Sequence, residues 1–208
     1  MRIVFARHGE SEANVEKVFS NRGWKHPLTP LGRQQAAELA ASLAGEAFDH
    51  IYASPVMRAT QTAEILGAHL GTPVEVVEEL REFDVGTSEG TSDPEGWHLH
   101  WEVISRWARG ESSARMPEGE SLVEIVDRLS QLLARLVGSA NHDSRFLLVG
   151  HGGLYVSALP RVLAGLDVQF CMVHGLRNCD VVVAEGERLP LRCVTWAGIP
   201  IEPQKSAE

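Results

Sequence analysis

The chain has 208 residues, of which 44% are hydrophobic and 23% charged, and its formal net charge is −9. A chain of this size buries about 70% of its unfolded surface, which is enough for one core without disulfides or metals. The acidic balance and the lack of a basic stripe argue against nucleic-acid binding, and no apolar run approaches the ~20 residues that cross a bilayer. We therefore expect one domain over residues 1–208 that binds neither nucleic acid nor a membrane.

The cysteines and the N-terminus predict a cytoplasmic protein. Cys171, Cys179 and Cys193 are odd in number and form no CxxC pair, a pattern typical of reduced thiols rather than of disulfides or a zinc ribbon. The apolar stretch at the N-terminus is too short for the core of a signal peptide and meets charged residues at once.

The first half of the chain predicts strands that alternate with helices. Short apolar runs indicate buried strands at 2–6, 50–53 and 74–77. Between them, a hydroxyl residue followed by proline predicts each helix start, at Thr29-Pro30 and at Ser54-Pro55. Glycines predict the helix ends, near Gly45 and Gly71.

The middle of the chain, residues 80–118, has no sustained periodicity and holds Trp97, Trp101 and Trp107. An irregular stretch of this length in a compact domain is usually a functional lid or insertion. We therefore expect a lid at about 80–118, with a short helix over 99–108.

The second half of the chain continues the alternation. Ser121 and Glu124 form a capping-box pattern ahead of an amphipathic helix that ends near Gly138. Strands are expected at 145–149, 181–184 and 191–195, a helix from residue 152 to about 164, and a frayed tail over 200–208. Strands that alternate with helices predict an α/β fold with a largely parallel sheet.

Basic residues follow three of the predicted strands. Arg7 and His8 come after the first strand, Arg58 soon after the second, and His151 after a later one. Because ligands of parallel sheets bind beyond the carboxyl ends of the strands, we expect these side chains to converge. Two guanidiniums suit a phosphate, and two imidazoles beside it could attack phosphorus and hold its oxygens. Taken alone, the pattern predicts an anion site.

Six blocks of sequence carry a family resemblance. They are Arg7-His8-Gly9-Glu10-Ser11, Leu28-Thr29-Pro30-Leu31-Gly32, Ser54-Pro55 with Arg58-Ala59, Leu80-Arg81-Glu82 with Gly86, Pro117 with Gly119-Glu120-Ser121, and Val149-Gly150-His151-Gly152-Gly153. In this order, from residue 2 to about 165, they resemble the histidine phosphatase superfamily, whose fold is phosphoglycerate-mutase-like.

The resemblance implies a three-layer α/β/α sandwich with a largely parallel central sheet, and a small phosphomonoester as the substrate. His8 would be the nucleophile that becomes phosphohistidine, and Glu82 would protonate the leaving oxygen. The residues that would hold the phosphate oxygens are Arg7, Arg58 and His151, and those that would bind substrate are Asn14, Ser20 and Gly152. A homodimer is compatible with this reading.

The same residues predict an enzyme without a metal or a cofactor. Two arginines and a histidine can stabilise the charge of phosphoryl transfer by themselves. His98 and His100 form an HxH pattern, but side chains two apart on a helix diverge, and the sequence shows no third ligand beside them.

Three activities fit such a chain: a phosphatase, a cofactor-dependent phosphoglycerate mutase, and a phosphate-binding module without catalysis. We predict a phosphatase because His151-Gly152-Gly153-Leu154 stands where mutases usually carry HGNSLR. The pairs Phe19-Ser20 and Gly23-Trp24 faintly resemble a mutase segment and keep that alternative open. A non-catalytic module would lack His8, Glu82 or His151, and all three are present.

Overall fold

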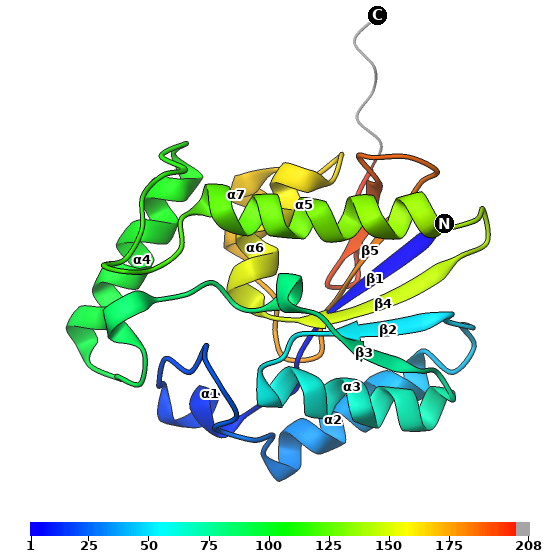
Figure 1. Ribbon diagram of the computed structural model, residues 1–208, viewed down its shortest axis with the longest axis horizontal. Coiled ribbons are helices and arrows are strands. Elements are labelled where there is room, and N and C mark those ends of the chain that lie inside the picture. Colours follow the sequence, from blue (N-terminus) through cyan, green and yellow to red (C-terminus); the bar gives the residue numbers. More distant parts are fainter. Residues whose placement is uncertain (203–208) are drawn as a thin grey trace, which may run out of the picture.

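A computed structural model describes residues 1–202, and residues 203–208 lie outside the described part of the chain. The strands are β1 (Arg2–Arg7), β2 (His50–Ala53), β3 (Val74–Val76), β4 (Arg145–Gly150), β5 (Val181–Glu185), β6 (Arg192–Trp196) and β7 (Ile199–Pro200). The helices are α1 (Glu12–Glu16), α2 (Pro30–Ser42), α3 (Met57–Leu70), α4 (Pro94–Ala108), α5 (Leu122–Ser139), α6 (Gly152–Val162) and α7 (Val168–His174). Figure 1 shows the sheet between two layers of helices, which confirms the α/β/α architecture.

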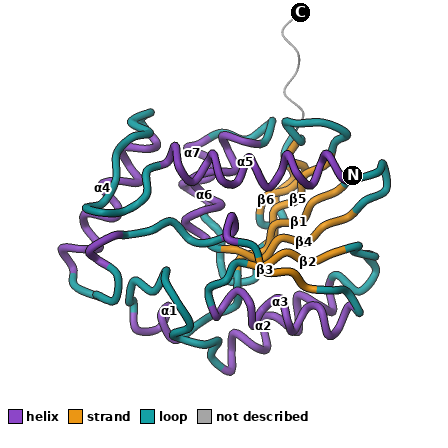
Figure 2. Tube along the Cα trace, in the orientation of Figure 1, coloured by secondary structure: helices purple, strands orange, loops and turns teal. Residues whose placement is uncertain are grey.

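The sheet has the strand order β3-β2-β4-β1-β5-β6-β7. The first four of these strands run parallel, and β5, β6 and β7 extend the sheet from β1 in antiparallel pairs. Figure 2 shows the parallel strands ending near the middle of the molecule, with α1 and α4 beyond their ends. The parallel half of the sheet therefore carries the edge at which a ligand site was expected.

Apolar residues of β1 supply both layers of the core. Ile3 and Phe5 pack in the cluster that holds α5 and α6, whereas Val4 and Ala6 pack in the cluster that holds α2 and α3. A strand buried on both faces needs apolar residues at every position, which explains why its sequence reads as a continuous run rather than an alternation.

Of the three helix starts predicted from capping residues, two are confirmed and one is wrong. The Thr29 hydroxyl accepts the N–H of Gly32 at 3.0 Å and begins α2, and the Ser121 capping box begins α5. The predicted start at Ser54-Pro55 is not used, because α3 begins at Met57 and Val56 is its N-cap residue. The Ser54 hydroxyl accepts the N–H of Val56 at 3.2 Å before the helix starts.

The segment 80–118 is more regular than its sequence suggested. Helix α4 begins at Pro94, five residues before the predicted start at residue 99, and Asp93 caps it by accepting the N–H of Gly96 at 2.7 Å. The short helices α1 and α7 and the strand β7 were not predicted. Pro200 lies in β7 and the N–H of Ile201 donates to the carbonyl of Val194 at 2.9 Å, whereas most of the tail that was expected to fray, residues 203–208, lies outside the described part of the chain.

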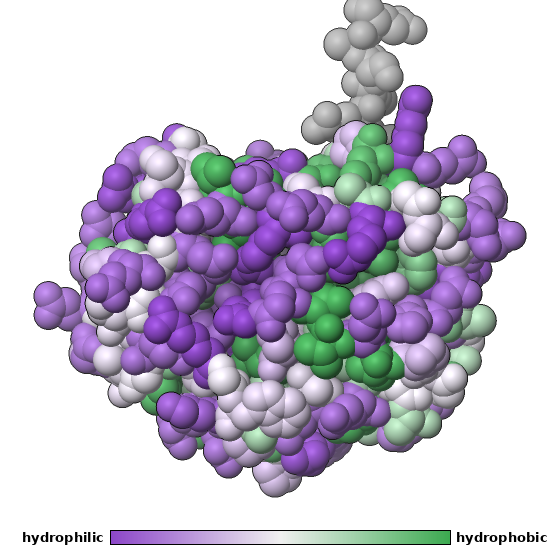
Figure 3. All heavy atoms as spheres, viewed as in Figure 1, coloured by the Kyte–Doolittle hydropathy of each residue, from purple (hydrophilic) through white to green (hydrophobic). Residues whose placement is uncertain are grey.

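The surface is mostly hydrophilic on the face drawn in Figure 3, where small apolar areas interrupt it. Within residues 1–202, the helices lack the combination of length and apolar character that a bilayer span requires.

Candidate active site

The carboxyl ends of β1 and β4 bring the two predicted histidines together. Arg7 at the end of β1 lies opposite Gly150 at the end of β4, and the N–H of His8 donates to the Gly150 carbonyl at 3.0 Å. His8 and His151 follow directly, and their ring centroids are 5.1 Å apart. The predicted convergence at the sheet edge is therefore observed.

His8 is held as a neutral ring with one defined tautomer. Its side chain is 2% exposed, and its Nδ1 lies 2.7 Å from the carbonyl of Gly9, to which it donates. Its Nε2 accepts the Nε–H of Arg58 at 2.9 Å. Burial, and next the charges of Arg58 and Arg7, hold the pKa of His8 well below its usual value. The lone pair therefore lies on Nε2 at neutral pH.

Arg58, in the first turn of α3, links the two imidazoles. Besides His8, its guanidinium donates from Nη2 to Nδ1 of His151 at 3.2 Å and from Nη1 to the carbonyl of Ser20 at 2.5 Å. Burial lowers the pKa of Arg58 to about 10, so that the group stays charged at neutral pH. A fixed cation therefore lies between two neutral rings.

His151 is fully buried and is held from its other side by Ser54. Because Nδ1 accepts from Arg58, Nε2 carries the proton and donates to the Ser54 hydroxyl at 2.8 Å. Burial, followed by the charge of Arg58, keeps the pKa of His151 well below its usual value. A hydroxyl can accept or donate, so Ser54 can support either neutral tautomer of the ring.

Arg7 supplies a second cation with spare hydrogen-bonding capacity. Its Nη1 donates to the carbonyl of Leu176 at 2.6 Å, whereas its buried Nε has no partner among the described residues. An unpaired buried donor is costly, and an anion bound beside Arg7 would satisfy it.

Glu82 lies at the amino-terminal end of α6, where backbone donors surround its carboxylate. The N–H groups of Gly153 and Leu154 donate to it at 2.9 and 2.6 Å, and that of Phe83 at 3.0 Å. Burial raises the pKa of Glu82, against the opposing effect of these donors and of Arg58. A side chain at Gly153 would place its Cβ 2.9 Å from both carboxylate oxygens, which explains the glycine there.

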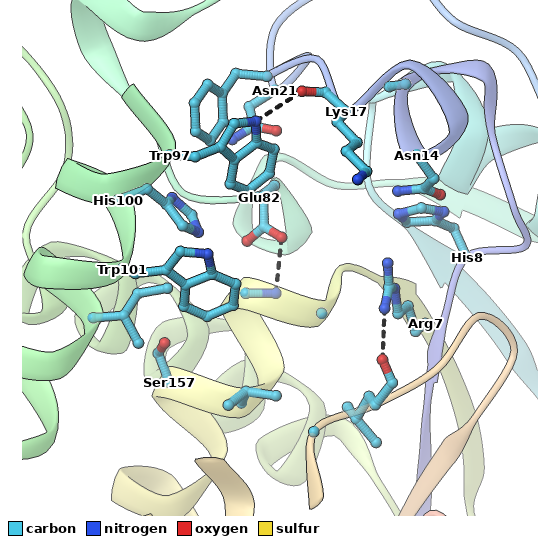
Figure 4. Close-up of a pocket in the computed structure, with 18 of the residues that line it drawn as sticks. Arg7, His8, Asn14, Lys17, Asn21, Glu82, Trp97, His100, Trp101 and Ser157 are labelled. Carbon is cyan, nitrogen blue, oxygen red and sulfur yellow. Dashed lines mark hydrogen bonds between the residues drawn. The ribbon is translucent and has the colours of Figure 1, made fainter. Parts of the chain in front are cut away.

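These residues line one cavity of about 380 Å³. Figure 4 shows Glu82 between the His8 and Arg7 side chains and the aromatic side chains of α4. The predicted residues that line the cavity are Arg7, His8, Asn14, Arg58, Glu82 and Gly152. His151 lies against Arg58, directly behind them.

Of the remaining predicted residues, Asn14 is positioned for a ligand and Ser20 is not. The Asn14 Oδ1 accepts from the N–H of Ser11 at 3.1 Å and from Asn178 at 3.3 Å, which leaves its amide hydrogens as donors toward the cavity. The hydroxyl of Ser20 lies 2.8 Å from Nδ1 of His26, and Ser20 is not among the described residues that line the cavity. Its carbonyl, rather than its side chain, supports the site through Arg58.

Sequence reasoning missed three further residues around the site. Ser54 was visible as the residue after a strand, but it was assigned to a helix cap. Asn21 donates to the carbonyl of Phe83 at 2.9 Å and lies 3.4 Å from Arg58, and Lys17 lines the cavity. Neither belongs to a motif or a periodic pattern that singles it out, although Asn21 lies in the loop 19–27 that was expected to contribute to the pocket wall.

Comparison with known proteins places the chain in a family. A family model described as histidine phosphatase superfamily (branch 1) matches residues 3–198. Over 192 residues the chain is 33% identical to "Putative phosphoserine phosphatase 2" of Hydrogenobacter thermophilus, covering 91% of this chain and 93% of that protein. Over 187 residues it is 30% identical to a "Probable phosphoglycerate mutase" of Salmonella choleraesuis, covering 87% and 83%.

Solved structures give the same result. A mycobacterial glucosyl-3-phosphoglycerate phosphatase in complex with VO3 superposes with a TM-score of 0.80 at 28% identity, covering 94% of this chain and 98% of that one. The alpha-ribazole phosphatase of Shigella flexneri gives a TM-score of 0.75 at 26% identity, covering 98% and 100%. The chain belongs to the histidine phosphatase superfamily.

Proposed function

We propose that the protein hydrolyses small phosphomonoesters in two steps, through a phosphohistidine on His8. The phosphatase assignment agrees with the relatives named as phosphatases of small phosphoesters. The observation that carries the mechanism is the tautomer of His8, whose unprotonated Nε2 lies beside two arginines at a cavity.

In the first step, Nε2 of His8 attacks phosphorus and the bond from phosphorus to the ester oxygen breaks. Arg7 and Arg58 hold the equatorial oxygens, where the charge of the transition state is spread. Arg58 must then turn its donors from the two imidazoles to the phosphate. In its other neutral tautomer, His151 carries its proton on Nδ1 and donates from there to the same phosphate, while its Nε2 accepts a hydrogen bond from the Ser54 hydroxyl.

The leaving oxygen receives its proton from Glu82. An acid must be protonated to act, and burial raises the pKa of Glu82 in that direction. In the second step the Glu82 carboxylate takes a proton from water as the water attacks phosphorus. The bond from phosphorus to Nε2 breaks, His8 regains its lone pair, and inorganic phosphate leaves.

In this proposal the chain acts as one catalytic domain, which the match over residues 3–198 supports, and residues 80–118 form a lid. Catalysis uses the charges of Arg7 and Arg58 in place of a metal. The three cysteines are free, as expected for a cytoplasmic protein, and a homodimer is compatible with the proposal.

The test is a panel of phosphomonoesters on which released phosphate is measured for the wild type and for His8→Ala. We expect turnover by the wild type and a loss of at least about 10³-fold in the variant, because a covalent nucleophile has no substitute. Release by the variant within tenfold of the wild type would remove His8 from this role. An inert wild type would instead favour a phosphate-binding module.

A phosphoglycerate mutase is the second candidate, because several relatives carry the name of a probable phosphoglycerate mutase. The enzyme would be incubated with 3-phosphoglycerate and catalytic 2,3-bisphosphoglycerate. Isomer interconversion faster than phosphate release from every panel ester would establish the mutase and contradict the hydrolase.

A further inference from the structure

We propose that the leaving group of the substrate is an uncharged apolar or aromatic group that packs on the α4 wall of the cavity. The inference rests on the proposed function for the phosphate end of the cavity and names the chemistry of the other end. It predicts a preference against small charged esters such as phosphoserine and phosphoglycerate.

The wall opposite the phosphate end is mostly aromatic and aliphatic, with the polar side chain of Ser157 beside Trp101. Trp97, His100, Trp101 and Ile104 of α4 line the cavity, and Val156 of α6 and Met172 of α7 continue it. Figure 4 shows His100 and Trp101 across the cavity from His8 and Arg7, with Glu82 between the two groups. A leaving group released next to Glu82 therefore lies against this wall.

The aromatic wall is assembled before any ligand binds. Trp97 stacks on Phe19 with ring centroids 4.1 Å apart, and its indole N–H donates to the carbonyl of Lys17 at 2.8 Å. His100 stacks on Phe83 at 5.2 Å, with an angle of 13° between the planes. Rigid surfaces lose little conformational freedom on binding, so the stacking area they offer is available to a ligand.

Trp101 differs from Trp97 and His100, because much of its apolar surface is exposed to solvent. It lines the cavity but is 58% exposed. An indole left half in water beside a cavity gains most from a ligand that covers it.

The charges of the cavity lie at its phosphate end. Lys17 is the one further Lys or Arg among the described residues that line the cavity, besides Arg7 and Arg58. Figure 4 shows Lys17 across from His100 and Trp101. Burial lowers the pKa of His100 to about 4, so its ring is neutral at neutral pH. A charged group on the leaving group would lose water against this wall and find no counter-charge among the α4 residues that line the cavity.

The hydrolysis test compares 2-phenylethyl phosphate with ethyl phosphate, whose alcohols have similar acidity, and with O-phosphoserine. We expect kcat/KM for the phenylethyl ester to exceed that for the ethyl ester by at least about 10-fold, as burial of a phenyl ring predicts. O-phosphoserine should be the poorest of the three. A ratio within twofold, or a preference for O-phosphoserine, would overturn the inference.

Trp101→Ala should reduce the ratio of kcat/KM for the phenylethyl ester to that for the ethyl ester by about 3- to 10-fold, mainly through a higher KM for the phenylethyl ester. Trp24→Ala is the matched control, because Trp24 is 63% exposed and is not among the residues that line the cavity. Equal effects of the two substitutions would contradict a role for Trp101.

A binding measurement separates this inference from the proposed function. Calorimetry with 3-phenylpropylphosphonate, propylphosphonate and 2-amino-4-phosphonobutyrate uses isosteres of the three esters that cannot be hydrolysed. The phenyl compound should bind at least about 10-fold more tightly than the other two. If no ester is hydrolysed but this order holds, the proposed function fails, whereas the binding of apolar groups by the α4 wall stands. If esters are hydrolysed but the order is flat or reversed, only the inference fails.

Discussion

Arg58 determines the chemical state of the site at the scale of single residues. Its guanidinium donates to Nε2 of His8 and to Nδ1 of His151, so both rings must present a lone pair to it. A cation held between two imidazoles also opposes their protonation, in the same direction as burial. The nucleophile is therefore ready before the substrate arrives, and phosphate oxygens take over the donors that Arg58 offers to the rings.

Glu82→Gln should slow an alkyl phosphate about 10²- to 10⁴-fold, because an alkoxide is too basic to leave without a proton. It should slow p-nitrophenyl phosphate much less, since p-nitrophenolate is a far weaker base. The measurement is kcat/KM of both enzymes on both substrates. An equal loss on the two would assign Glu82 to binding or folding instead of proton transfer.

Ser54→Ala should lower kcat by about tenfold, because His151 would lose the hydrogen bond that orients its ring. Thr60→Val is the control: the Thr60 hydroxyl is also buried and donates to the Ser54 carbonyl at 2.9 Å, but it does not contact His151. The expected signature is a fall in kcat with Ser54→Ala and little change with Thr60→Val. Equal activity of the two variants would show that the contact between Ser54 and His151 is not used in catalysis.

At the scale of elements, sequence patterns located most of the strands and helices but not the contacts between residues far apart in the sequence. Parallel strands end at one edge, so residues after β1 and β4 had to meet, whatever the loops did. Glu82 is different: two of its three backbone donors, Gly153 and Leu154, lie 71 and 72 positions away in sequence, and no local rule connects them to it. The fold is thus predictable from periodicity, whereas long-range polar contacts are not.

The errors at two helix starts concern the same sequence signature. Asp93-Pro94 carries the same cap-and-proline signature that located α2, but it lies in a stretch without an apolar period and was passed over. Ser54-Pro55 carries that signature too, yet the Ser54 hydroxyl is bound to His151 and the helix begins later. A capping residue can be used by the site instead of by the helix, and local sequence does not distinguish the two.

Helix α4 should make stability sensitive to acid through His100. Because burial depresses the pKa of His100 to about 4, the unfolded chain binds a proton below about pH 6.5 that the folded chain does not. As far as His100 is concerned, the free energy of unfolding therefore has its full value above pH 6.5 and decreases as the pH falls toward 4. Between pH 7 and 5 the loss amounts to about 2 kcal/mol.

Urea unfolding at pH 7 and pH 5 measures this effect. His100→Phe should lose about 2 kcal/mol less than the wild type over that interval, whereas the exposed neighbour variant His98→Gln should match the wild type. The same loss in His100→Phe as in the wild type would mean that other groups, such as His8 and His151, carry the acid sensitivity.

For the whole molecule, the distribution of charge is more informative than its sum. The net charge of the chain is −9, yet the cavity is lined by Arg7 and Arg58, which lie beside the neutral imidazole rings of His8 and His151. A cationic site in an acidic molecule suits a small anion better than a large polyanion, which the surrounding surface repels. The positive charge that phosphoryl transfer needs is therefore local.

Dialysis against excess EDTA should leave hydrolysis within about twofold of the untreated enzyme, because the guanidiniums stabilise the equatorial oxygens. The assay compares one ester before dialysis, after it, and after addition of Mg²⁺. Activity that disappeared with the chelator and returned with Mg²⁺ would contradict catalysis by arginine alone.

The stereochemical course at phosphorus tests the central claim, a covalent intermediate on His8, most directly. A thiophosphate ester made chiral with ¹⁶O and ¹⁷O would be hydrolysed in H₂¹⁸O, and the configuration of the released thiophosphate determined. Each in-line transfer inverts phosphorus, so transfer to Nε2 of His8 and then to water predicts net retention. Net inversion would mean that water attacks the ester directly, and would contradict the phosphohistidine mechanism.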